Sequence, residues 1–216
     1  MRTKSDTFIT VASWEDRFLR GFARVLDEAP IRSAVVLYSH RYSAWTIEAR
    51  EKVHAMCIDK GVDLETGVLH DTDTAASWSR TLTPVIAGLP TGASVLVDIT
   101  TMPRDIIWQC FWLLELRRCT LSYVYHRPQQ YGQWLSRDPG RPRLTYKMSG
   151  IARMGARTAL VILAGYDIDR VKHLTDVFEP AVTLLGLQVD SVDPHNSSKM
   201  SAVKSAFAGD SSVELF

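Results

Sequence analysis

Short apolar runs alternate along this chain with longer segments in which apolar residues recur every three or four positions. In residues 15–28, for example, Phe18, Phe22, Val25 and Leu26 follow the spacing of one helix face. The pattern predicts strands at 8–12, 34–38, 64–69, 94–98 and 121–125, with helices at 15–28, 44–60, 75–87 and 106–116 between them. Strands that alternate with helices form a parallel sheet with helices on both faces. Residues 1–126 are therefore expected to form a Rossmann-like α/β domain.

The alternation stops at residue 127 and resumes at residue 158. Residues 127–157 carry seven Arg and Lys residues against a single acid, Asp138, with three aromatic residues among them. This segment is interpreted as a basic connector, and a hairpin is one form that it would take. Residues 158–216 then repeat the beginning of the chain: a strand, an aromatic residue, an acid and an arginine follow one another at 8–17 and again at 160–170. Because the second copy ends at its third strand, 213–216, we expect a partial second α/β repeat.

The composition narrows the class of protein. The chain has 216 residues, 46% hydrophobic and 23% charged, which is typical of a globular protein. A net charge of +1 excludes attraction of the whole surface to nucleic acid or anionic lipid, so any such contact needs a local patch. Cys57, Cys110 and Cys119 form no CxxC pair and are interpreted as reduced core thiols. The N-terminus has no apolar signal core and no run is long enough to span a bilayer, so we expect a cytoplasmic protein without membrane contact.

Candidate ligand-binding residues gather at the carboxyl ends of the predicted strands, where parallel α/β sheets bind their ligands. The fourth strand runs into Asp98-Ile99-Thr100-Thr101-Met102-Pro103-Arg104. Two hydroxyls, a proline suited to the first helical position and an arginine in the first turn are typical of an anion site. The neighbouring loops add aromatic rings for stacking, cations for phosphate and acids for ribose hydroxyls. The predicted ligand-binding residues are Ser13, Trp14, Glu15, Arg17, Ser39, Tyr42, Asp98, Thr100, Thr101, Arg104 and Tyr125.

Structural roles are the alternative for several of these residues. Ser13 and Asp98 are suited to capping helices, and adjacent threonines are common in turns. Trp14 is suited to packing in the core as well as to stacking on a base. The core is also expected to hold Trp108, Phe111 and Trp112.

No metal, cofactor or catalytic motif stands out. The six histidines show no HxxxH or HExxH spacing, and the chain has no GxSxG elbow, no Walker A loop and no GxGxxG. We therefore predict neither a metal site nor a bound cofactor. Asp71, Asp73 and Asp98 leave open a carboxylate cluster at the edge of the sheet, with Asp98 or Glu15 as a general base.

The loop at 98–104 resembles the corresponding loop of the CRISPR-associated Rossmann-fold (CARF) sensors of anti-phage defence, where a strand leads into Thr-Gly-Gly-Thr-Lys before a helix. By position, Thr100 matches the first threonine and Arg104 matches the lysine, whereas Thr101 and Met102 replace the two glycines. The resemblance implies that this loop receives phosphates of a cyclic oligonucleotide, generally across the interface of a homodimer. It also implies a second contact from the loop after the first strand.

Three functions stay open from the sequence. The leading hypothesis is a sensor module that binds a nucleotide or cyclic oligonucleotide second messenger and controls an effector domain or protein in prokaryotic defence. The first alternative is a nucleotide-processing enzyme on the same scaffold, such as a hydrolase, glycosidase or ring nuclease. The second is a nucleic-acid or protein adaptor that acts through the basic connector.

Overall fold

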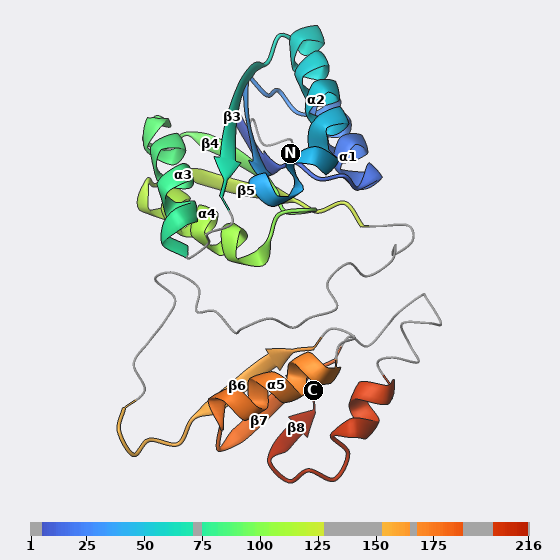
Figure 1. Cartoon of the computed structure of the whole chain (residues 1–216). Coiled ribbons are helices and arrows are strands. Elements are labelled where there is room, and N and C mark those ends of the chain that lie inside the picture. The colour runs from blue at the N-terminus through green and yellow to red at the C-terminus, as the bar shows by residue number, and fades with distance from the viewer. Residues whose placement is uncertain (1–5, 71–74, 128–152, 165–167, 188–200, 216) are drawn as a thin grey trace. The chain divides into compact units, whose positions relative to one another are not determined.

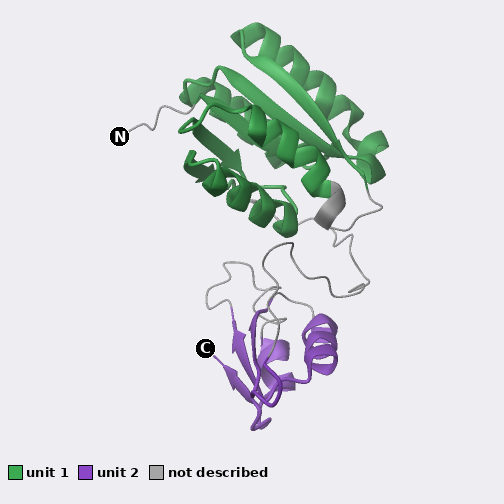
Figure 2. Ribbon diagram, turned by 90° about the vertical axis from the view of Figure 1, so that its left-hand side faces the viewer, with its two compact units in different colours: residues 1–132, 145–148 green, residues 133–144, 149–216 purple. Residues whose placement is uncertain are grey.

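The computed structural model describes residues 6–70, 75–127, 153–164, 168–187 and 201–215. The chain divides into two compact units, shown in different colours in Figure 2. Unit 1 comprises residues 1–132 and 145–148, and unit 2 comprises residues 133–144 and 149–216. Most of the predicted basic connector lies outside the described residues.

Unit 1 contains a five-stranded sheet in which every neighbouring pair of strands is parallel. The strands are β1 (Thr7–Val11), β2 (Ser33–Ser39), β3 (Asp63–Leu69), β4 (Ser94–Asp98) and β5 (Thr120–Val124), in the order β3-β2-β1-β4-β5. The helices between successive strands are α1 (Asp16–Glu28), α2 (Ile47–Lys60), α3 (Ala75–Gly88) and α4 (Arg104–Leu116). The predicted Rossmann-like parallel sheet is confirmed.

Helices cover both faces of this sheet, with α1 and α2 on one face and α3 and α4 on the other (Figure 1). On the first face, Phe8 of β1 packs with Phe18 and Phe22 of α1. On the second face, Ile9 of β1 belongs to a separate core that includes Leu82 of α3. Adjacent residues of a strand point to opposite faces, so consecutive apolar residues of β1 supply both cores.

Two helix starts differ from the sequence prediction. The helix predicted from residue 44 begins instead as the 3-10 helix η1 (His40–Thr46), and α2 starts only at Ile47. The Thr46 hydroxyl donates to the Tyr42 carbonyl oxygen at 3.2 Å, a local bond that competes with regular helix. The second difference is at α4, where Pro103 is the N-cap, with φ of -55° and ψ of 140°, and Arg104 is the first helical residue.

The direction of strand order reverses between β1 and β4. The chain winds from β1 outward through β2 to β3, then returns to β4 on the other side of β1 and continues to β5. Loops that follow neighbouring strands at such a reversal lead to helices on opposite faces and leave a crevice at the carboxyl ends. The loops after β1 and β4 therefore flank the expected ligand position.

Unit 2 contains a three-stranded parallel sheet in the order β6-β7-β8. Its elements are β6 (Ala159–Leu163), α5 (Ile168–Phe178), β7 (Val182–Gly186) and β8 (Val213–Leu215), and residues 201–206 form a further helical segment before β8. Successive pairing of three parallel strands repeats the pattern of β1, β2 and β3, so the predicted partial second α/β repeat is confirmed. Its core contains Ile162, Val171, Leu185, Val203 and Phe207.

The expected burial of three aromatic residues in α4 needs correction. Trp108 is 53% exposed, and Phe111 and Trp112 are only partly buried. The buried residues of α4 are Ile106, Gln109, Cys110 and Leu114, which lie on the side of the helix opposite Trp108, whereas Phe111 packs against the edge of the same core. Because α4 packs against the sheet on one side only, one face of the helix is buried, although apolar residues lie on both faces.

Two of the three cysteines lie in the core of unit 1, as the sequence predicts. Cys57 and Cys110 are buried, Cys119 is partly buried, and all three are free thiols. Burial raises the pKa of the Cys110 thiol to about 12, so it stays protonated at neutral pH. Within the described ranges, no helix has the length and apolar character needed to cross a membrane.

Candidate functional site

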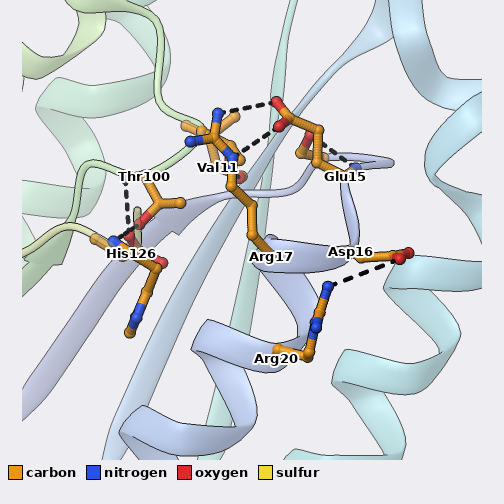
Figure 3. Close-up of polar contacts among 10 residues, drawn as sticks. Val11, Glu15, Asp16, Arg17, Arg20, Thr100 and His126 are labelled. Carbon is orange, nitrogen blue, oxygen red and sulfur yellow. Dashed lines mark hydrogen bonds and ion pairs between the residues drawn. The ribbon is translucent and has the colours of Figure 1, made fainter. Parts of the chain in front are cut away.

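Side-chain hydroxyls tie the loop after β4 to the strands on either side of it. The Thr101 hydroxyl donates to the carbonyl oxygen of Val11, at the end of β1, at 2.9 Å. The Thr100 hydroxyl accepts from the backbone N–H of His126, just beyond β5, at 2.8 Å (Figure 3). The carboxyl ends of β1, β4 and β5 are thereby held together. We call this region, with the loops after β1 and β2, the carboxyl edge of unit 1.

Asp98 is the buried acid at the centre of the carboxyl edge. Its side chain is fully buried, and its Oδ1 accepts the backbone N–H of Thr100 at 2.8 Å. Its Oδ2 has no hydrogen-bond partner among the described residues. Burial raises the pKa of this carboxyl above its ordinary value, although hydrogen bonds from Thr100 and the nearby His126 and Arg17 oppose that shift. Asp98 therefore shapes the turn at Thr100 and does not cap a helix.

Arg17 and Glu15 form the charged pair of the carboxyl edge. The Arg17 guanidinium donates to both carboxylate oxygens of Glu15, at 2.7 and 3.2 Å (Figure 3). Glu15 is itself fixed, because its backbone N–H donates to the Ser13 hydroxyl at 3.2 Å. Burial opposes the charged form of Arg17, but Glu15 and Tyr125 outweigh burial and raise its pKa. The arginine is thus a fixed, permanently charged group beside Asp98.

Two further buried polar atoms lie near Asp98 without a hydrogen-bond partner among the described residues. They are the hydroxyl of Thr10 and Nε2 of His126. The register that pairs Ile9 with Val97, extended by one residue, brings Thr10 next to Asp98 on the neighbouring strand. A buried polar group left unpaired costs about 1–3 kcal/mol, so natural proteins rarely gather several in one place.

Exposed aromatic rings occupy the β1–β2 side of the carboxyl edge. The ring centroids of Trp14 and Tyr42 are 4.9 Å apart, and Trp45 meets Trp14 edge-on at 5.7 Å. The guanidinium of Arg41 lies 5.6 Å from the Tyr42 ring centroid. Trp14 and Tyr42 are each 37% exposed, so neither is a core residue. Exposed, mutually packed rings beside cations suit the stacking of a planar ligand.

The helices that start at the crevice have no side-chain caps. The N-cap residues of α1 and α4 are Glu15 and Pro103, and neither side chain caps its helix by a hydrogen bond. The first N–H groups of an α-helix lack intrahelical partners and carry partial positive charge. In α4 the Asp105 carboxylate accepts the Ile106 N–H at 3.1 Å, so the N-terminus of α1, beside Arg17, is the end better suited to an anion.

The structure brings together most of the residues predicted from the sequence. Contacts link Ser13, Glu15, Arg17 and Tyr125 around the loop after β1, and Asp98, Thr100 and Thr101 around the loop after β4. Trp14 and Tyr42 form the aromatic pair. Ser39 is the last residue of β2 and precedes Tyr42 by three positions in the sequence.

Arg104 is the predicted residue that these contacts do not include. It is exposed at the first position of α4, and within the described part of the chain its side chain makes no hydrogen bond or ion pair. Asp71 and Asp73 lie outside the described residues, so the proposed carboxylate cluster stays a prediction.

Sequence reasoning missed two members of the site. Trp45 contacts Trp14, and its signal is the spacing of one helical turn from Tyr42. His126 has no local signal, since its role depends on contacts with Thr100 and with α1 across the fold.

Comparisons with known proteins assign no family. No family model matches the chain, and no curated protein matches it in sequence. What the structure supports of the CARF resemblance is the parallel, Rossmann-like α/β fold. Within the described ranges, no group of three or more His, Cys, Asp or Glu side chains is arranged to hold a metal ion.

Proposed function

We propose that the carboxyl edge of unit 1 binds a nucleotide or cyclic oligonucleotide, and that binding is sensed rather than followed by reaction. A Rossmann-like α/β scaffold is compatible with nucleotide binding, and folds of this kind bind ligands beyond the carboxyl ends of their strands, at the switch point that lies here between β1 and β4. In this proposal the ligand is a second messenger of prokaryotic defence, as the CARF resemblance implies, and an effector domain or protein receives the signal.

The exposed Trp14–Tyr42 pair beside Arg17 is the observation that carries the proposal. A nucleotide has a planar base and an anionic phosphate, so its recognition needs an aromatic surface and a cation a short distance apart. Trp14 is separated from Arg17 by two residues, and both follow the carboxyl end of β1. The N-terminus of α1 adds partial positive charge for the phosphate.

The exposure of each side chain indicates its role in binding. Trp14 and Tyr42 stack on the base. When a phosphate binds, the Arg17 guanidinium either leaves the Glu15 carboxylate or contacts the carboxylate and the phosphate together. Asp98 is fully buried, so in this conformation it positions the turn that carries Thr100. Glu15, which is more exposed than Arg17, is then available to a ribose hydroxyl.

Calorimetric titration of the full chain tests this proposal, with mononucleotides and cyclic di-, tri- and tetranucleotides as probes. Trp14→Ala should weaken binding by about 1–3 kcal/mol, the usual value of one stacked base. Arg17→Met should weaken it by about 1.5–3 kcal/mol, the value of a hydrogen bond to a charged group. Arg24→Met is the matched control, because Arg24 lies on the same helix, is exposed and pairs with Glu28.

Two results would refute the proposal. The first is the absence of binding to every probe at millimolar concentration. The second is binding that Trp14→Ala and Arg17→Met leave unchanged, or that Arg24→Met weakens equally, since the ligand would then lie elsewhere on the surface.

A nucleotide-processing enzyme is the second candidate, and Asp98 favours it. A carboxyl whose pKa is raised by burial, with His126 and Arg17 nearby, has the perturbed environment that is typical of groups that transfer protons. Incubation of each bound nucleotide with the wild-type chain, followed by chromatography, separates the candidates. Turnover that Asp98→Asn abolishes while binding persists would favour the enzyme, and binding without turnover favours the sensor.

A further inference from the structure

The Glu15 carboxylate occupies the cation that the proposed function assigns to the phosphate. The Arg17 guanidinium donates through Nε to one carboxylate oxygen at 2.7 Å and through a terminal nitrogen to the other at 3.2 Å (Figure 3). Arginine binds a phosphate with the same two-point geometry. The carboxylate therefore stands where an anionic ligand would bind.

Both partners of this pair are held at the start of α1. Arg17 lies in the first turn of the helix, and Tyr125, which follows β5, also interacts with its guanidinium. Glu15 is the N-cap residue, and its backbone N–H donates to the Ser13 hydroxyl at 3.2 Å. Because one short segment carries both charges, the carboxylate meets the guanidinium at a high effective concentration. An anion from solution has to compete with it.

The two side chains differ in exposure. The Glu15 side chain is 41% exposed and the Arg17 side chain is 21% exposed. The carboxylate is thus the partner that has more room to move into water. Ion pairs that are exposed to this degree shift an equilibrium by up to about fivefold. This pair is strong enough to weaken the binding of a competing anion, yet a ligand with further contacts can displace it.

We propose that Glu15 is an internal competitor for Arg17 that disfavours the binding of small free anions, such as inorganic phosphate. A free anion offers the guanidinium only its charge, and the loss of the Glu15 contact offsets part of that gain. A phosphate joined to a planar base also stacks on the exposed rings of Trp14 and Tyr42. Glu15 raises the concentration at which any anion occupies Arg17, and stacking lowers that concentration again for a nucleotide.

The sign of one substitution separates this role from a favourable contact with the ligand. Glu15→Gln removes the charge but keeps the size of the side chain and an oxygen that accepts from a ribose hydroxyl. If Glu15 only contacted the ligand, the substitution would weaken binding or leave it unchanged. Internal competition predicts tighter binding. The inference rests on the proposed function in taking Arg17 as the phosphate-binding cation, and probes without a base test it separately.

Titration of the full chain with inorganic pyrophosphate, followed by NMR of the Arg17 Nε–H signal, measures the competition without a nucleotide. The signal is identified by its loss in Arg17→Met. Glu15→Gln should bind pyrophosphate about fivefold more tightly than the wild type. Asp16→Asn is the matched control, because Asp16 is the adjacent acid, is exposed and pairs with Arg20 at 3.9 Å (Figure 3). It removes the same charge and should change the affinity by less than about twofold.

Three results would overturn the proposal: no binding of pyrophosphate by Glu15→Gln, binding no tighter than that of the wild type, or an equal gain in Asp16→Asn. Circular dichroism verifies that each variant is folded.

A nucleotide that binds the wild type provides the second measurement. The inhibition constant of inorganic phosphate against this nucleotide should be about fivefold lower in Glu15→Gln than in the wild type. If pyrophosphate binds Glu15→Gln more tightly but no nucleotide binds either protein, the internal competition stands and the proposed function fails. If a nucleotide binds and Glu15→Gln leaves the inhibition constant unchanged, the proposed function stands and the internal competition is refuted.

Discussion

Replacing Gly21 by alanine tests the packing of α1 against the carboxyl edge. Gly21 is buried in α1, and a Cβ there would lie 2.8 Å from Nε2 and 3.1 Å from Cγ of His126. Real side chains do not approach one another so closely. The bond from the His126 backbone N–H to the Thr100 hydroxyl holds the backbone of His126 in place, so the contact is relieved by rotation of the imidazole or by a shift of α1. The substitution therefore forces the imidazole, or α1 itself, to move.

Two opposing effects set the size of the change. Alanine is a better helix residue than glycine by about 1 kcal/mol, which favours the variant. Overpacking a filled site costs about 1–3 kcal/mol, which disfavours it. We expect a net loss of about 1 kcal/mol in the free energy of unfolding of Gly21→Ala.

The same substitution should change sign when the imidazole is absent. In His126→Ala the obstacle is gone while the backbone bond to Thr100 stays, so adding Gly21→Ala should stabilise the protein by about 1 kcal/mol. The coupling between the two positions is then about 1–3 kcal/mol, the cost of overpacking.

Urea unfolding of the four proteins of this double-mutant cycle, followed by circular dichroism, measures the coupling. Gly88→Ala serves as the control, since a Cβ at the end of α3 meets no atom within 4 Å and should not destabilise the protein. If Gly21→Ala stabilises both backgrounds equally, His126 does not pack on α1, and the arrangement described for the carboxyl edge is wrong.

Two further predictions concern the turn after β4. Thr101→Val removes the hydrogen bond to the Val11 carbonyl and should lower the free energy of unfolding by about 0.5–1.5 kcal/mol, whereas Thr101→Ser should retain most of it; urea titrations compare them. For Asp98, the folded pKa is raised above the ordinary value of 3.8, so the folded state holds more protons between the two pKa values and stability falls as pH rises through that window. Above about pH 4, the unfolding free energy of the wild type should therefore fall with rising pH relative to that of Asp98→Asn, in which residue 98 does not titrate. A rise of the wild-type value relative to the variant would contradict the assignment.

Most of unit 1 follows from the local pattern of the sequence. The strand at Ser94–Asp98 begins and ends where the apolar run predicts, and Gly61, with φ of 63°, ends α2 as expected. Consecutive apolar residues such as Phe8 and Ile9 indicate a strand that is buried on both faces. The spacing of apolar residues and the glycine that ends a helix are local signals, which lie within a few residues of one another. Such local signals can be recognised in a single sequence.

The orientation of α4 could not be predicted in the same way. Its sequence places apolar residues around most of its circumference, including Ile106, Trp108, Phe111 and Leu114. Which of them face the sheet depends on how the helix crosses β4 and β5, and the sequence pattern is compatible with several angles. Trp108 was therefore expected inside and lies outside.

The candidate site likewise has one part that the sequence predicts and another that it does not. Topology alone brings the loops after β1 and β4 to one crevice, so a set of residues on those loops could be named from the sequence. The contacts of the two threonines could not, because each joins residues that are distant in the chain: Thr101 to Val11, and Thr100 to His126. The same holds for the burial of Asp98, whose neighbours Arg17 and His126 come from distant parts of the chain.

These long-range contacts bear on how the crevice would hold a phosphate. In a glycine-rich loop the backbone itself approaches the phosphate, because no side chain stands in the way. Here the hydroxyls of Thr100 and Thr101 are engaged with neighbouring strands, and Met102 is buried in the core. The loop after β4 is thus a rigid wall, and the atoms available to a ligand are the side chain of Arg17 and the exposed rings beside it. Affinity that resides in side chains rather than in a backbone cradle should respond to single substitutions at Trp14 and Arg17, and this is the behaviour that the titrations measure.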